Sequence, residues 1–189
     1  MTDAVDAHEL VELLPRDSTP LTYWDPILGP EGQKVLEEVP QASRETVKNE
    51  ALSILRRCVP PNDEGGRRTG LVIGYIQSGK TLSFTTVSAL ARDNGYQLII
   101  VITGTTTDLF DQSNERLTRD LDLNRSRRWK RYRSDKLHRG AVNSIRSALS
   151  RWSNPNVPET RRQTVLLTVM KERTHLDRVN EFLAKLDLD

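Results

Sequence analysis

The 189-residue chain has little of what builds cross-links or membrane spans. Its one cysteine, Cys58, excludes an internal disulfide and a thiolate metal site, and we interpret it as a small apolar residue on a helix face. No apolar run approaches the ~20 residues that a membrane-spanning helix needs. The first 14 residues contain acids but no Lys or Arg, so they do not resemble a secretory signal. We therefore expect a cytoplasmic protein with no membrane partner.

Aromatic residues are also scarce, at 5%, and the three histidines are scattered without the spacing of a metal site. The chain is 36% apolar and 29% charged, which is typical of one globular domain with a modest core. Its net charge is only +2, so the function class depends on where charges cluster rather than on their sum.

The N-terminal third predicts an extension to the main domain. Residues 4–14 have the pattern of a short amphipathic helix, and four prolines in residues 15–30 predict an irregular arm. Residues 41–58 place apolar side chains at helical spacing, and the segment PPNDEGG then breaks the helix. We assign residues 1–65 to a helical and irregular extension and residues 66–189 to the main domain.

In the main domain, short apolar runs alternate with helical patterns. Three runs are interpreted as buried strands, at residues 70–75, 97–104 and 164–170. The helical patterns cover residues 81–93, 107–121, 138–153 and 175–186. Apolar strands separated by helices predict a parallel sheet that is covered on both faces. The expected fold class is therefore α/β with three layers.

The motif GYIQSGKT lies between the first strand and the first helix of that domain, and it fits G-x-x-x-x-G-K-[ST] without a mismatch. Glycines allow the backbone to turn tightly around a phosphate chain, and the start of the helix favours negative charge. Lys80 supplies a charge for the β- and γ-phosphates, and the Thr81 hydroxyl is the expected Mg²⁺ ligand. The predicted nucleotide-binding residues are Gly74, Tyr75, Ile76, Gln77, Ser78, Gly79, Lys80 and Thr81.

Two further segments are candidates for nucleic-acid contact. Thr105 and Thr106 follow the second strand, and ligands gather at the carboxyl ends of parallel strands. We expect Thr105, Thr106 or Thr107 to cap the following helix in either case, and nucleic-acid contact would come in addition.

Residues 125–139 hold eight Lys and Arg against one acid, with Trp129 and Tyr132 interleaved. Such charge binds phosphates, and aromatic rings stack on bases. The candidates here are Arg127, Arg128, Trp129, Lys130 and Arg131. The alternative is a solvated connection in which Trp129 packs onto the domain.

The order of these motifs resembles the first RecA-like half of superfamily 2 helicases. More narrowly, it is similar to the helicase-like ATPase region of putative endonucleases that carry the Z-one domain. The resemblance rests on residues 76–81 (IQSGKT), on Gly95-Tyr96 before an Ile/Val-rich strand, and on the helix with DQSNERL, and it spans residues 41–186. The chain departs from the family at residues 105–107, where the family often has His and Asn, and at Lys171-Glu172, where it often has paired lysines.

This resemblance implies a RecA-like P-loop NTPase sheet with ATP and Mg²⁺, DNA as partner, and a restriction or defence-type endonuclease as the context. In this family an acidic motif follows a fourth buried strand, and hydrolysis needs it. The chain has only LDLD at that place, so we identify no catalytic residue and expect an incomplete sheet. The acidic motif, a second lobe and an effector domain are expected beyond Asp189. The alternative function is a nucleotide-binding P-loop kinase or regulatory module without nucleic-acid activity.

Overall fold

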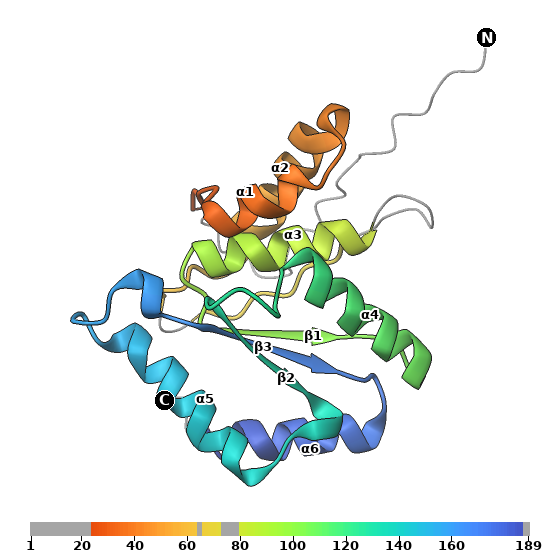
Figure 1. The fold of residues 1–189 in the computed structure, drawn as a ribbon, viewed down its shortest axis with the longest axis vertical. Helices are drawn as coiled ribbons and strands as arrows, with labels where there is room; N and C mark the ends of the chain where they lie inside the picture. Colours follow the sequence, from red (N-terminus) through yellow and green to blue (C-terminus); the bar gives the residue numbers. More distant parts are fainter. Residues whose placement is uncertain (1–23, 64–65, 73–79, 187–189) are drawn as a thin grey trace, which may run out of the picture.

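The computed structural model describes residues 24–63, 66–72 and 80–186 (Figure 1). Its three strands are β1 (Leu98–Ile102), β2 (Trp129–Arg133) and β3 (Thr164–Val169), which form one parallel sheet in the order β1-β3-β2. The helices are α1 (Pro30–Glu37), α2 (Gln41–Arg56), α3 (Lys80–Asp93), α4 (Thr107–Asp120), α5 (Arg139–Ser153) and α6 (Arg173–Ala184). Two 3₁₀ turns are η1 (Ser134–Lys136) and η2 (Glu159–Arg161).

Helices cover both faces of the sheet (Figure 1). On one face, Ala89 of α3 and Leu117 of α4 pack against Leu166 of β3. On the other face, Ile145 of α5 and Phe182 of α6 pack against Val165, the preceding residue of the same strand. Helices α1 and α2 lie on the outer side of α3 (Figure 1). The predicted α/β class and the parallel, doubly covered sheet are therefore confirmed.

The central strand β3 is buried at every residue, because it has a neighbour on each side and helices on each face. Residues Leu98 of β1 and Lys130 of β2 both pair with Val165, and the parallel register continues along the strands. Burying one Val or Leu side chain stabilises a fold by about 1.5–3 kcal/mol. The run TVLLTV therefore contributes strongly to the core, and its boundaries agree with the predicted strand at 164–170.

The helical patterns predict α2 to α6 to within two residues at each end, and the run 97–104 corresponds to β1. The predicted helix at 4–14 lies outside the described residues. None of the described helices is long and apolar enough to cross a membrane.

The prediction of a strand at 70–75 is wrong for the residues of this range that the structure describes. Leu71 and Val72 have no regular structure, and their side chains are 68% and 59% exposed. Residues 73–75 lie outside the described part. An apolar run becomes a strand only where a neighbour accepts its backbone hydrogen bonds, and periodicity does not report neighbours.

Two elements were not expected from the sequence. Helix α1 begins within the proline-rich arm, because Pro30 occupies the first helical turn, where a missing N–H costs nothing. Strand β2 has the sequence WKRYR, whose charges favour a solvated connection, yet it pairs with β3 along its length. It is an edge strand of the described sheet, and edge strands accommodate charged side chains.

Helix α1 is capped by a residue from another helix. Its N-cap position is Gly29, which has no side chain, and Asp93 at the end of α3 accepts the N–H groups of Glu31 (3.1 Å) and Gly32 (2.7 Å) instead. A Cβ atom at Gly29 would lie 2.7 Å from Cγ of Asp93, so this approach requires glycine. Burial raises the pKa of Asp93, and the hydrogen bonds from the two N–H groups oppose that rise.

We expect Asp93→Ala to lower the free energy of unfolding by about 1–2 kcal/mol, because a lost N-cap costs roughly that much. Urea denaturation of the variant and the wild type measures the difference. The matched control is Asp177→Ala, which removes an exposed carboxylate 3.7 Å from Arg173 and should cost less than about 0.5 kcal/mol. Equal effects from the two variants would contradict the capping role.

Candidate functional site at the carboxyl edge of the sheet

The strands end at the edge of the sheet where helix α3 begins (Figure 1). Helix α3 starts at Lys80, so the last residues of GYIQSGKT open it. Of the predicted nucleotide-binding residues, Gly74 to Gly79 lie outside the described part, as do the side chains of Lys80 and Thr81. The N–H groups in the first turn of a helix have no partner within the helix, and they favour an anion. This edge is therefore suited to phosphate by its backbone.

The loop after β1 is tied to the end of β3. The N–H of Thr103 donates to the carbonyl of Val169 (2.8 Å), and the N–H of Lys171 donates to the carbonyl of Gly104 (3.0 Å). Thr106 then caps α4, because its Oγ1 accepts the N–H of Leu109 at 3.4 Å. The capping role expected for this threonine segment is confirmed, and the nucleic-acid role of Thr105 and Thr106 stays a prediction.

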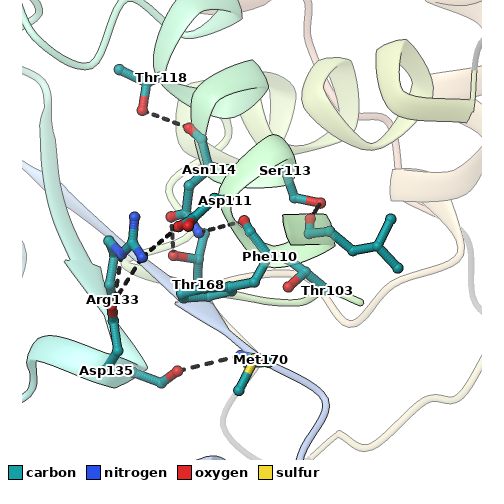
Figure 2. Close-up of polar contacts among 12 residues, drawn as sticks. Thr103, Phe110, Asp111, Ser113, Asn114, Thr118, Arg133, Asp135, Thr168 and Met170 are labelled. Atoms are coloured by element: carbon teal, nitrogen blue, oxygen red, sulfur yellow. Dashed lines mark hydrogen bonds and ion pairs between the residues drawn. The ribbon is translucent and has the colours of Figure 1, made fainter. Parts of the chain in front are cut away.

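Arg133, the last residue of β2, is held by two carboxylates at this edge (Figure 2). Its Nη2 donates to Asp111 of α4 (2.7 Å), and its Nε donates to Asp135 (3.0 Å). Its Cζ lies 4.6 Å from the centre of the Phe110 ring. Hydrogen bonding to Asp135 raises the pKa of Arg133. Burial works to raise the pKa of Asp135, but the hydrogen bond and charge of Arg133 outweigh it, so that pKa is lowered.

A polar pair lies buried beneath this cluster (Figure 2). The hydroxyl of Thr168 in β3 donates to Oδ1 of Asn114 in α4 (2.5 Å), and Nδ2 of Asn114 donates to the carbonyl of Phe110 (2.8 Å). Both side chains have hydrogen-bond partners, so their burial does not carry the free-energy cost of an unpaired polar group. The pair therefore fixes the position of α4 on β3. The sequence contained a signal for it, since Phe110, Asn114 and Leu117 share one helical face.

Ser134 and His175 join the ends of β2, β3 and α6. The Oγ of Ser134 accepts the N–H of Met170 (3.3 Å) and lies 2.9 Å from Nδ1 of His175. A hydroxyl oxygen can accept two hydrogen bonds and donate one, so the tautomer of His175 decides which of the two groups donates. Ser134 is fully buried, so the pair fastens the edge together and does not present a nucleophile to substrate.

The nucleic-acid candidates from the sequence are divided between opposite ends of the sheet. Arg127 and Arg128 precede β2 at its amino end, whereas Thr105 and Thr106 follow β1 at its carboxyl end. A strand rises about 3.3 Å per residue, so the five residues of β2 separate the two groups by more than about 10 Å. The structure therefore does not bring these candidates into one site.

Trp129 lies in the core, and its Nε1 donates to Glu31 of α1 at 2.9 Å. A buried ring offers no face to a base, so the structure favours the alternative in which Trp129 packs into the domain. Lys130 is half-buried and donates from Nζ to the carbonyl of Ser144 (2.9 Å), while Arg131 is exposed in the middle of β2.

No family model, curated protein or solved structure matches the chain. Among the described residues, no group of three or more His, Cys, Asp or Glu side chains is arranged to hold a metal ion. Asp111 and Asp135, two of the acids at the carboxyl edge, are both paired with Arg133, and Glu172 after β3 caps α6 by accepting the N–H of His175. The N–H groups at the start of α3 are the feature of this edge that favours an anion.

We expect Asp135→Asn to destabilise the fold at pH 7 by less than about 1 kcal/mol, because the ion pair with Arg133 is partly exposed. The pKa of Asp135 in the folded state lies below its ordinary value of 3.8. The carboxylate therefore contributes stability above that value, and the contribution is lost as the pH falls through the folded-state pKa.

Urea denaturation of both proteins from pH 7 to pH 2.5 tests this sign. The difference between wild type and variant should shrink as the pH falls below 3.8. A difference that grows toward low pH would contradict the assignment.

Proposed function

We propose that the chain is the ATP-binding N-terminal part of a DNA-acting, helicase- or translocase-like ATPase, of the kind found in restriction or defence-type endonucleases. One observation carries the proposal. The helix that GYIQSGKT opens begins at the carboxyl edge of a parallel sheet, where phosphate ligands bind in α/β folds. The fold proposed for the complete domain is a RecA-like P-loop NTPase.

In this proposal the backbone of Gly74 to Gly79 surrounds the phosphates of ATP. Lys80 contacts the β- and γ-phosphates, and the Thr81 hydroxyl holds Mg²⁺. Asp111 and Asp135 are paired with Arg133, so we do not assign them the role of activating water. The attacking water needs a carboxylate from a further strand.

The free edge of β1 supports the expectation that the sheet continues. Within the described residues β1 pairs only with β3, which leaves the hydrogen-bonding groups of its other edge unpaired. Ile100 and Ile102 in this strand are 37% and 56% exposed. Leu186, beyond the end of α6, packs in the same cluster as Leu98 at the start of β1.

A segment that follows α6 would thus begin beside the amino end of β1. A parallel strand on that free edge would end at the carboxyl edge, near the start of α3. This is the position that the proposed acidic motif requires, in a polypeptide that also carries the second lobe and the effector domain.

We expect Lys80→Ala to weaken MgATP binding by about tenfold or more, since a hydrogen bond to a charged group contributes roughly 1.5–3 kcal/mol. Isothermal titration calorimetry on the 189-residue chain measures it. Lys185→Ala, which removes an exposed lysine behind α6, is the charge-matched control and should bind like the wild type. Thr81→Ala should reduce the dependence of ATP affinity on Mg²⁺.

Equal binding by wild type and Lys80→Ala would contradict the nucleotide site. The motor function needs a second assay in a polypeptide that extends beyond Asp189. There, single-stranded DNA should stimulate ATP hydrolysis, and Lys80→Ala should abolish the stimulation. Phosphorylation of a small acceptor, with no effect of DNA, would favour the kinase alternative instead.

A further inference from the structure

Two basic segments meet at the amino end of the sheet, opposite the phosphate motif. One is residues 125–130, before and into β2, and the other is residues 151–162, between α5 and β3. The N–H of Thr164 donates to the carbonyl of Arg128 (3.0 Å), and Nε2 of Gln163 donates to the carbonyl of Arg127 (3.1 Å). We call their joint surface the amino-edge basic surface.

This surface carries seven cationic side chains and one acid, Glu159. Four of the seven are exposed and three are half-buried: Arg125, Arg127, Arg151 and Arg161 are exposed, and Arg128, Lys130 and Arg162 are half-buried. The nearby carboxylate of Glu31 is buried and is already engaged by Trp129 (2.9 Å) and by Arg128 (3.6 Å). The exposed positive charge therefore has little local compensation.

A buried arginine behind the surface adds to its excess of positive charge. Arg92 of α3 is 1% exposed, and its Nε and Nη1 make no hydrogen bond to any described residue. Its Nη1 lies 4.0 Å from Glu159, whose side chain is largely exposed. Burial lowers the pKa of Arg92, and the charge of Arg128 lowers it further. Nη2 of Arg92 donates to the carbonyl of Arg162 (3.3 Å), and the charges of Glu31, Asp93 and Glu159 offset part of the effect of burial. An anion on the surface would add to this compensation of a buried charge.

Like charges are also crowded on the surface itself. Burial lowers the pKa of Lys130, and the positive charge of Arg151 adds to this effect. Crowding of this kind destabilises a free protein and is relieved when a polyanion binds.

We propose that the amino-edge basic surface binds the phosphate backbone of a nucleic acid, at the end of the sheet remote from the nucleotide motif. The class of partner rests on the proposed function. The large apolar side chains that are exposed in the described residues all lie outside the two segments, so the surface lacks the anchors of a membrane-binding site. Trp129 is buried, and Trp152 lies near the guanidinium groups of Arg92 (5.7 Å) and Arg162 (5.9 Å). The contact is thus made to phosphates and is independent of base sequence.

The test uses fluorescence anisotropy with a labelled single-stranded oligonucleotide and its duplex, over a range of salt concentrations. The variant Arg127→Ala/Arg151→Ala/Arg161→Ala removes three exposed charges from the surface. We expect it to lower affinity at least about tenfold and to reduce the slope of log affinity against log salt by about 2, because each phosphate contact contributes roughly 0.7 to that slope. The matched control, Lys136→Ala/Lys171→Ala/Arg173→Ala, removes the same net charge from exposed side chains at the carboxyl edge and should bind nearly as tightly as the wild type.

A third variant changes affinity in the opposite direction, which a folding defect cannot imitate. Glu159→Gln removes the acid of the surface and should raise affinity about twofold to fivefold, the range expected for one exposed charge. The proposal is overturned if the two triple variants lose affinity equally, or if the carboxyl-edge variant loses more. It is also overturned if vesicles of anionic lipid or polyglutamate bind as tightly as the oligonucleotides and with the same dependence on these arginines.

Nucleotide binding is measured on the same proteins. Lys80→Ala should leave the oligonucleotide affinity unchanged, and the amino-edge triple variant should keep its affinity for MgATP. A failure of the nucleotide site is thereby separated from a failure of the amino-edge basic surface.

Discussion

The burial of β3 between two other strands is the constraint on which the rest of the structure depends. All six of its residues are enclosed, and successive side chains point to opposite faces, so both faces need a helical cover. Helices α3 and α4 supply one cover and α5 and α6 the other. The parallel direction of the strands follows from these crossover helices, and it brings the strand ends and the start of α3 to one edge.

The carboxyl edge is then organised by polar contacts rather than by further apolar burial. Asn114 and Thr168 fix α4 on β3, while Arg133 holds Asp111 and Asp135. These bonds engage two of the acids at this edge. These bonds hold the carboxyl edge together, and the start of α3 presents N–H groups there that favour an anion. If the chain belongs to a hydrolytic ATPase, the carboxylate that activates water must come from another strand.

The arginines at the two ends of the sheet are compensated to different degrees. At the carboxyl edge Arg133 is paired with Asp111 and Asp135, whereas behind the amino edge two nitrogens of Arg92 have no hydrogen-bond partner among the described residues. A nucleotide at one edge and a nucleic acid at the other would be connected through the strands and through α3, which runs from Lys80 to Arg92 and Asp93. The helix that opens at the phosphate motif thus ends beneath the amino-edge basic surface.

Of the elements in the described residues, the sequence by itself determined the α/β class, five of six helices, two of three strands and the capping of α4, because helical periodicity, apolar runs and cap residues are local signals. Only the tertiary structure decided that the charged segment WKRYR is a strand, that Trp129 is buried, and that Arg127 and Thr105 lie at opposite edges. The physical reason is distance along the chain. Trp129 finds its partner Glu31 98 residues away, and β2 exists because β3 offers it hydrogen bonds, so neither outcome is written in the residues nearby.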